Sequence, residues 1–236
     1  MASLRWPSQA RSSHGVGSAN TGRSSSRRRP LFPPKRAILS VSDARAEAGE
    51  DMPMQKVAVF GNAGGGKSTL SRQLAEVTGL PLYTLDIIQF RGGRYRPEEK
   101  NGGKIPNDEY LSIHRDILSR DEWIIDGYGS LPSTLERLSA ADTLVYIDLP
   151  VIAHYWGVTR RFAAGLFQNP KGWPDNSPVW ESTLDGYRVV WLCHRRLTPR
   201  YRQRIADEAS FKQVRHLTSR AARKAFLHAA ANRQRR

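Results

Sequence analysis

The residues best suited to chemistry lie in a glycine-rich stretch, KVAVFGNAGGGKST, at residues 56–69. Residues 61–68 match the pattern G-x-x-x-x-G-K-S, in which successive backbone N–H groups surround an anion that bulkier side chains would keep out. Lys67 supplies a positive charge for the β- and γ-phosphates of a nucleotide, and Ser68 offers a hydroxyl ligand to Mg²⁺. The stretch therefore predicts a site for ATP and Mg²⁺. The predicted binding residues are those of the loop itself: Gly61, Asn62, Ala63, Gly64, Gly65, Gly66, Lys67, Ser68 and Thr69.

Two regular elements must position this loop. The apolar run KVAVF before it is typical of a buried strand in a parallel sheet. Apolar residues after it fall at helical spacing, so we expect a helix from about Lys67 to Gly79. The N-terminus of that helix would add its unpaired N–H groups and partial positive charge to the phosphate site.

Two acidic residues follow short apolar segments further along the chain. The segment LPLYTLD at 80–86 is expected to be a second strand ending at Asp86, and EWIIDG at 122–127 a third with Asp126 at its end. Ligands of parallel α/β sheets bind at the carboxyl ends of the strands, so both carboxylates should lie beside the loop. Asp126 is predicted to bind the metal together with Ser68. Three roles are open for Asp86: it could be a general base, a substrate anchor or a turn residue.

The rest of the chain continues the alternation of strands and helices. Further helices are expected at 107–120, 132–141, 153–167, 182–196 and 219–230, and further strands at 143–150 and 211–217. The pattern predicts an α/β fold, namely a three-layer P-loop NTPase fold with a five-stranded, mainly parallel sheet and helices on both faces. Asp148, at the end of the fourth strand, is predicted to be structural. His114 and His154 lie on helical segments without metal-ligand spacing and are expected at or near the surface.

Domain boundaries follow from changes in composition. Residues 1–52 are rich in Ser, Gly, Arg and Pro and are expected to be disordered, either as a transit segment, a true tail or an upstream extension. Residues 53–231 form the predicted domain, and 232–236 a basic tail. The Pro- and Trp-rich stretch QNPKGWPDNSPVW predicts a lid-like insertion at about 165–183.

The distribution of charge and the number of cysteines indicate which binding partners and which cellular compartment to expect. The formal net charge is +15, and the excess lies at the ends, with eight basic and no acidic residues in 1–42 and fourteen basic against two acidic in 188–236. This favours weak, non-specific nucleic-acid contact or simply solvated ends. The single cysteine excludes an internal disulfide and fits the cytoplasm. No apolar run approaches about 18 residues, so no membrane partner is expected, and we expect a monomer.

The segments GNAGGGKSTLSRQLAEVTGLPLYTLD, WIIDGYGS and ADTLVYIDLP resemble the small P-loop kinases of the adenylate and shikimate kinase type. The chain is most similar to a bacterial adenylate-kinase-like branch labelled DNA topology modulation protein, over about residues 55–227. The resemblance implies that Asp126 orients Mg²⁺ through water, that Asp86 faces the phosphoryl acceptor, and that Arg160 and Arg161 neutralise charge during transfer. Together with Lys67, these are the candidate catalytic residues.

The chain departs from adenylate kinases at the acceptor side. Such kinases usually carry an arginine directly after the third strand, but DGYGSLPS has none, and Arg137 lies a turn further on. The loop at 87–106 is long and basic, with Arg91, Arg94 and Arg96 able to hold another anion. The favoured hypothesis is therefore a kinase for an unidentified nucleotide or small hydroxyl or phosphate acceptor. The alternatives are a nucleotide-regulated nucleic-acid-binding protein that affects DNA topology, and a non-catalytic ATP sensor.

Overall fold

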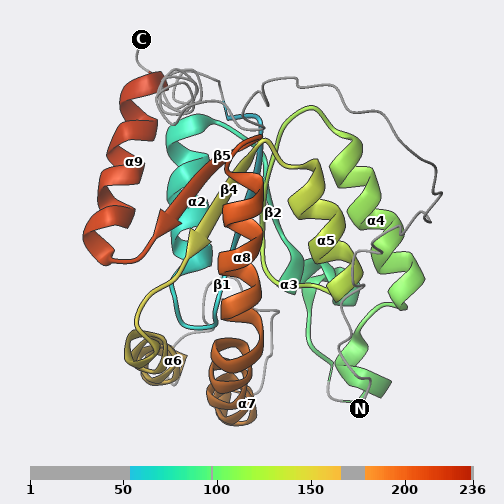
Figure 1. The fold of residues 1–236 in the computed structure, drawn as a ribbon. Helices are drawn as coiled ribbons and strands as arrows, with labels where there is room; N and C mark the ends of the chain where they lie inside the picture. The colour runs from blue at the N-terminus through green and yellow to red at the C-terminus, as the bar shows by residue number, and fades with distance from the viewer. Residues whose placement is uncertain (1–53, 97, 166–178, 235–236) are drawn as a thin grey trace, which may run out of the picture. The chain divides into compact units, whose positions relative to one another are not determined.

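The computed structural model describes residues 54–96, 98–165 and 179–234. A five-stranded sheet with the order β2-β3-β1-β4-β5 runs through these residues (Figure 1). All four strand pairings are parallel. The predicted α/β fold with a five-stranded sheet is therefore confirmed. The strands are β1 (Lys56–Gly61), β2 (Leu82–Thr84), β3 (Trp123–Asp126), β4 (Thr143–Ile147) and β5 (Gln213–Leu217).

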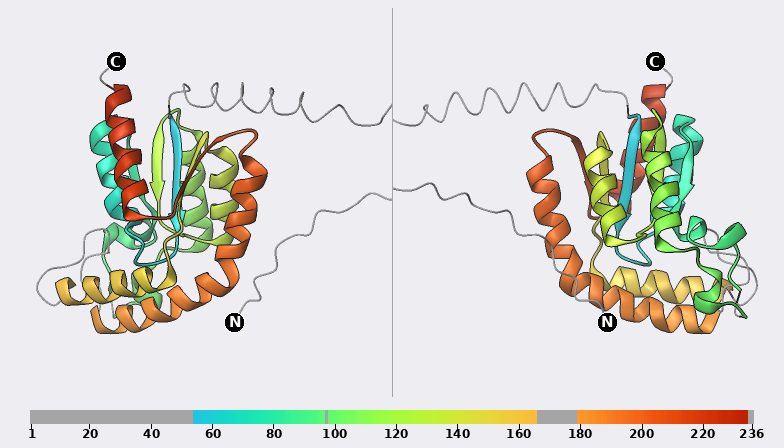
Figure 2. Two further views of the ribbon diagram at one scale, coloured as in Figure 1. Left: turned by 60° about the vertical axis from the view of Figure 1, so that its left-hand side comes forward. Right: turned by 90° about the vertical axis from the view of Figure 1, so that its right-hand side faces the viewer.

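Helices cover both faces of the sheet. Figure 2 shows α2 and α9 on one side of it and α4, α5 and α8 on the other, with α6 and α7 below the carboxyl ends of the strands. The α-helices are α2 (Lys67–Thr78), α3 (Leu85–Ile88), α4 (Asn107–Ser119), α5 (Leu131–Ala140), α6 (Val151–Gly165), α7 (Val179–Leu192), α8 (Thr198–Glu208) and α9 (Arg220–Gln234). Two short 3₁₀ turns, η1 (Arg91–Gly93) and η2 (Lys100–Gly103), lie between α3 and α4, and a π turn, η3 (Cys193–Leu197), joins α7 to α8.

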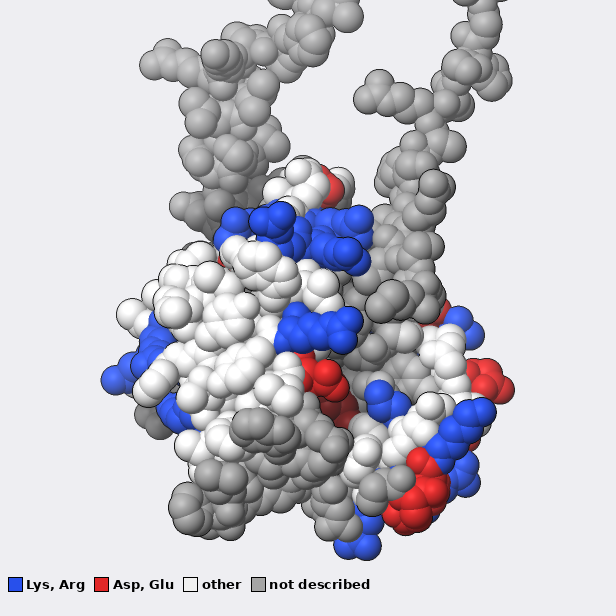
Figure 3. All heavy atoms as spheres, turned by 90° about the horizontal axis from the view of Figure 1, so that it is seen from below, with Lys and Arg blue, Asp and Glu red and all other residues white. Residues whose placement is uncertain are grey.

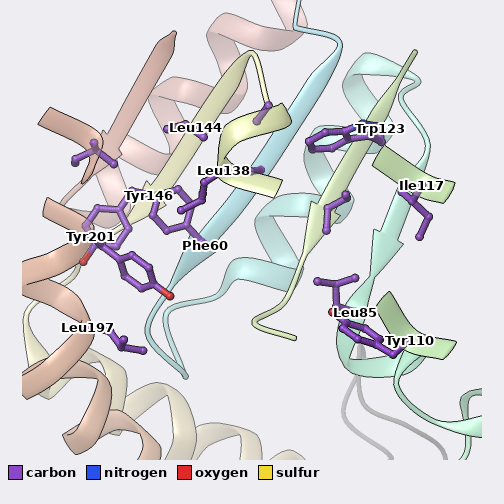
Figure 4. Close-up of a cluster of buried hydrophobic side chains, with 14 residues drawn as sticks. Phe60, Leu85, Tyr110, Ile117, Trp123, Leu138, Leu144, Tyr146, Leu197 and Tyr201 are labelled. Carbon is purple, nitrogen blue, oxygen red and sulfur yellow. The ribbon is translucent and has the colours of Figure 1, made fainter. Parts of the chain in front are cut away.

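Alternate residues of β1 enter two separate hydrophobic clusters. Val57 and Val59 pack with residues of α2 and α9, whereas Ala58 and Phe60 pack with residues of α4, α5 and α8. Figure 4 shows the second cluster. Each of these four side chains is at most 2% exposed, so each contributes on the order of 1–3 kcal/mol of burial free energy. The central strand is thus fixed from both sides, and so is the point at which it ends.

The loop after β1 lies where the strand order changes direction, between β3 and β4. Ligands of open α/β sheets bind at such a point, beyond the carboxyl ends of the strands. Helix α2 begins at Lys67, directly after the loop, and ends before Gly79, whose φ of 74° and N–H bond to the Ala75 carbonyl (2.8 Å) form a left-handed cap. The predicted strand, glycine-rich turn and helix are therefore present.

Three local predictions differ from the structure. Strand β2 ends at Thr84, and Asp86 lies in the first turn of α3 rather than at the end of a strand. A carboxylate in the first helical turn is favoured by the helix dipole. Helix α8 has no counterpart in the sequence pattern, because Pro199 suggests a break, yet proline is well tolerated in a first turn.

Helix α7 begins at Val179, before the expected start at 182. Most of the predicted lid-like insertion, like the N-terminal segment 1–52, lies outside the described residues. Within the described part, no helix is both long enough and apolar enough to cross a bilayer.

Candidate active site

The loop at the end of β1 has the backbone conformation that its glycines predict. Gly64 and Gly66 have φ values of 71° and 82°, in the left-handed region that residues with a Cβ rarely adopt. The Lys67 ammonium folds over the loop and donates a hydrogen bond to the Asn62 carbonyl (3.1 Å). The Asn62 side chain donates to the Val190 carbonyl of α7 (2.9 Å), which ties the loop to that helix.

Two further helices contact the outer side of this loop. The imidazole of His154, on α6, lies 2.9 Å from the Ala63 carbonyl through Nδ1. Arg223, on α9, donates from Nη1 to the Gly65 carbonyl at 3.3 Å. His154 is only 2% exposed and His114 is fully buried, so the expectation that both lie at or near the surface is wrong. Each lies on a helix face that packs inward, which their isolated positions in the sequence did not indicate.

Asp126 ends β3 beside this loop and has an unusual environment for a carboxylate. It is 0% exposed, and neither of its oxygens has a hydrogen-bond partner among the residues that the structure describes. Burial raises its pKa, while the charge of Lys67 and the nearby Ser68 hydroxyl oppose that rise. The hydroxyl is close enough to act on the pKa but does not form a hydrogen bond of normal geometry. Unpaired buried carboxylates are costly, so these oxygens are available to a ligand.

This arrangement fits a magnesium ion bound together with a nucleotide. Ser68 and Asp126 provide hard oxygen donors, and the orphaned Asp126 oxygens lie next to the phosphate loop. In the described part of the chain, no group of three or more His, Cys, Asp or Glu side chains could hold a metal by itself. Mg²⁺ commonly needs only one or two protein oxygens, because phosphates and water complete its shell.

Asp86 and Arg161 approach Asp126 from two other elements. Gly127 has a φ of 111°, and a Cβ there would lie 3.1 Å from the Asp86 Oδ1 atom, so glycine lets this carboxylate come close. Burial lowers the pKa of Arg161, on α6, while the charges of Asp86 and Asp126 oppose that decrease. The structure thus brings these three charges together beside Lys67.

Arg160, the neighbour of Arg161, lies elsewhere. It is exposed, and its charge acts on Arg223 of α9 rather than on the two acids. Consecutive residues of a helix point about 100° apart, and Arg161 is the one whose charge interacts with the two acids. A catalytic role for Arg160 stays a prediction.

Arg137 is a site residue whose importance the sequence pattern did not indicate. Its side chain is 0% exposed, and Nη2 donates to the Gly127 carbonyl at 3.0 Å. Its Nε and Nη1 atoms have no partner within the described residues. Burial lowers its pKa, and the charges of Asp126 and Asp86 are among those that oppose this effect. No signal in the sequence marks this position, because an arginine on an amphipathic helix is normally exposed.

A cavity of about 710 Å³ lies between the long loop after α3 and the start of α4. It has the size of a small-molecule site and contains two lysines and no acid. Its lining residues are Gln89, Lys100, Asn101, Lys104, Ile105, Pro106, Asn107, Tyr110 and Ser130.

The arginines expected to hold an anion in this loop do not line that cavity. Arg91 and Arg94 are exposed, and Arg96 forms an ion pair with Glu99 at 2.7 Å. Lys100 and Lys104 take their place, because the two 3₁₀ turns bring the second half of the loop to the cavity. Figure 3 shows the molecule from below, where acidic side chains lie at the base of a hollow and basic side chains lie beside it.

No protein-family model matches the chain, and no curated protein matches it in sequence. Among solved structures, it is similar to a shikimate kinase from Acinetobacter baumannii in complex with shikimate, at 19% identity and a TM-score of 0.48, over 78% of this chain and 93% of that one. A sugar kinase from Janibacter sp. HTCC2649 is 14% identical, with a TM-score of 0.41, over 76% and 94%. A gluconokinase from Sinorhizobium meliloti 1021 is 15% identical, with a TM-score of 0.40, over 77% and 91%. Likeness of this extent identifies no substrate, and the resemblance to the DNA topology modulation branch stays a prediction.

Proposed function

We propose that this chain is a Mg²⁺-dependent kinase that transfers the γ-phosphate of ATP to a small hydroxyl-bearing acceptor. The observation that carries the proposal is Asp126, a fully buried carboxylate whose two oxygens lack partners among the described residues, beside Lys67 and Ser68 at the phosphate loop. A protein that only binds ATP does not need a buried, unpaired carboxylate, which costs folding free energy. A protein that transfers phosphate needs an acid to position the metal.

The nucleotide-binding half of the proposed mechanism rests on the loop and α2. Backbone N–H groups of the loop and the N-terminus of α2 bind the β- and γ-phosphates, and Lys67 binds their oxygens with a full charge. Ser68 and Asp126 would hold Mg²⁺, which supplies charge neutralisation at the phosphates. The remaining work of these residues is to keep the terminal phosphate in line with its acceptor.

The acceptor half rests on Asp86 and Arg161. Asp86 accepts the proton of the acceptor hydroxyl while that oxygen forms its bond to the γ-phosphorus and the bond from phosphorus to the β,γ-bridging oxygen breaks. Arg161 stabilises the negative charge on the phosphoryl oxygens as they move between the two partners. Arg137, fully buried and hydrogen-bonded to the Gly127 carbonyl, adds a fixed positive charge that acts on both acids.

The cavity beside α3 is the proposed acceptor site. Gln89, at the end of α3, is three residues from Asp86 in sequence, so the cavity begins next to the proposed base. Its two lysines and the absence of an acid in its lining favour an acceptor that carries negative charge as well as a hydroxyl.

The test is a screen of ATP consumption against nucleotides, nucleosides, sugars and hydroxylated carboxylic acids, with and without DNA. Lys67→Ala serves as the control, because it removes the charge that binds the phosphates. We expect one class of small acceptor to stimulate ADP formation by the wild-type protein and not by the variant. Stimulation by DNA alone, or by no acceptor, would contradict the proposal.

The alternative of a nucleotide-regulated nucleic-acid-binding protein rests on the basic C-terminal part. Two of its arginines are already engaged in ion pairs, Arg202 with Asp148 and Arg204 with Glu208. These pairs reduce the positive charge available for a polyanion. The DNA arm of the screen decides between the two functions.

A further inference from the structure

The phosphate loop is held from outside by two side chains that the mechanism above does not use. In a trans peptide, the carbonyl of one residue and the N–H of the next point in opposite directions. The Ala63 carbonyl faces His154 of α6, so the Gly64 N–H points away from that helix. The Gly65 carbonyl faces Arg223 of α9, so the N–H of the next residue points away from α9.

His154 is built into this contact rather than placed there by chance. A Cβ on Gly65 would lie 2.9 Å from the His154 Cε1 atom, so a glycine is needed to admit the ring. Because a carbonyl only accepts hydrogen bonds, Nδ1 must carry the proton. Burial lowers the pKa of His154, helped by the charge of Lys67 and opposed by the carbonyls of Ala63 and Leu149. The ring is therefore neutral, with its proton directed at the loop.

Arg223 makes its contact at an electrostatic cost. It is half-buried, and burial together with the charges of Arg220 and Arg160 lowers its pKa. No acidic side chain pairs with it in the part of the chain that the structure describes. A guanidinium kept among like charges, with a loop carbonyl as its hydrogen-bond acceptor, is favoured when an anion binds next to that loop.

We propose that His154 and Arg223 are positioning residues of the phosphate loop, which hold the Ala63 and Gly65 carbonyls outward and so aim the N–H groups of Gly64 and Gly66 at the β-phosphate of a nucleotide. This inference rests on the nucleotide site of the proposed function. Donors that already point at the anion need no reorganisation when it binds, so the two side chains raise affinity without touching the ligand.

The test measures the affinities of the full-length chain for ADP, AMP and inorganic pyrophosphate by isothermal titration calorimetry. His154→Leu and Arg223→Met each remove the donor that holds one loop carbonyl. We expect the ADP and pyrophosphate affinities to fall by about 10-fold or more in each variant. This is the usual effect of losing a hydrogen bond to a charged group, here the bond from a loop N–H to the β-phosphate. AMP, which has no β-phosphate, should lose less, so the ratio of AMP to ADP affinities should rise.

Two control variants show whether a loss of affinity comes from the lost hydrogen-bond donor, from the lost positive charge or from misfolding. His154→Asn keeps a donor near the place of Nδ1 and should restore most of the ADP affinity. Lys224→Gln removes an exposed charge one residue along α9 and should leave the affinity within about twofold of wild type, as for a screened surface charge. If His154→Leu does not fold, Arg223→Met, at a half-buried position, decides.

The inference is overturned if folded His154→Leu and Arg223→Met bind ADP as tightly as the wild type does. It is also overturned if ADP and AMP affinities fall by the same factor, or if the wild type binds neither ADP nor pyrophosphate. Loss of ADP affinity in both variants supports it even if no acceptor in the screen is phosphorylated, and in that case only the proposed function fails.

Discussion

Asp126 and Asp148 occupy similar places in the sheet and have opposite environments. Both lie at the carboxyl ends of the strands that flank β1, and both are almost fully buried, at 0% and 8% exposure. Asp148 accepts hydrogen bonds from Arg202 (2.7 and 3.1 Å) and lies 2.8 Å from His216 Nε2. Asp126 has no such partner among the described residues. The oxygens of Asp148 are already satisfied within the fold, whereas those of Asp126 are available to bind the proposed metal ion.

Their pKa directions agree with this division. Burial tends to raise the pKa of Asp148, but the hydrogen bonds and charges of Arg202 and His216 outweigh it, and the pKa is lowered. Burial raises the pKa of Asp126, and the charges of Lys67 and Arg137 do not outweigh it. The ionised form of Asp148 therefore stabilises the folded state, whereas the ionised form of Asp126 is disfavoured in the folded, ligand-free protein.

The largest expected effect concerns turnover. Asp126→Asn should lower kcat by about 10²–10³-fold, because metal positioning matters most where charge develops in the transition state. The ATP affinity should stay nearly unchanged, since the loop and Lys67 supply most of it. Steady-state kinetics and calorimetry measure the two quantities. An unchanged kcat in the variant would mean that Asp126, like Asp148, has no role in the reaction.

Asp86 tests whether a second acid belongs with Asp126. Asp86→Asn should lower transfer to the acceptor by about 10²-fold, the usual effect of losing a general base. Background ATP hydrolysis should fall less, because water does not need a base placed for the acceptor. Asp121→Asn, at an exposed position before β3, is the control. An equal loss of both rates would assign Asp86 to the metal site or to the turn instead.

Asp148 should affect stability rather than catalysis. Asp148→Asn should lower the free energy of unfolding by about 2 kcal/mol, less than for a fully buried pair because solvent screens Arg202 and His216. A lowered pKa means that this stability is present at neutral pH and is lost as pH falls below about 4. Denaturant titrations from pH 7 to pH 3 should show a shallower acid decline in the variant. A loss of kcat without a loss of stability would contradict the structural role.

The smallest expected effect is a gain in the stability of the ligand-free protein. Asp126→Asn should stabilise the ligand-free protein at pH 7 by about 1 kcal/mol, since a neutral amide costs less to bury than a carboxyl group whose charged form burial disfavours. For a domain of this size, the melting temperature should rise by about 2–4 °C. A decrease would mean that the carboxylate has a structural partner. Scanning calorimetry without nucleotide or Mg²⁺ measures this quantity, with Asp148→Asn as the opposite control.

Much of this framework could be predicted from the sequence, because it depends on local patterns. The strand, glycines and helix of residues 56–79 have strong neighbour-to-neighbour signals, and the alternation of apolar segments with amphipathic ones indicates a parallel sheet. The pattern was less informative where an element is short. Strand β2 has only three residues, so the turn into α3 was placed too late.

The support of the site could not be predicted, because it joins residues that are far apart in sequence. His154 and Ala63 are separated by 91 residues, and Arg223 and Gly65 by 158. No local period reports which face of α6 or α9 meets the loop. For the two strand-end acids, the sequence predicted different roles but not their partners, since only the fold brings Arg202 and His216 to Asp148 and leaves Asp126 without them.

The most direct test of phosphate transfer at Asp126 is the single-turnover rate of γ-phosphate transfer from labelled ATP, measured against Mg²⁺ concentration. It requires the acceptor found in the screen and three proteins: wild type, Asp126→Asn and Asp148→Asn. We predict that Asp148→Asn follows the wild-type curve. Asp126→Asn should need more Mg²⁺ and should reach a plateau rate about 10²–10³-fold lower than the wild-type rate. Superimposable curves for wild type and Asp126→Asn would contradict the assignment of this carboxylate to the reaction.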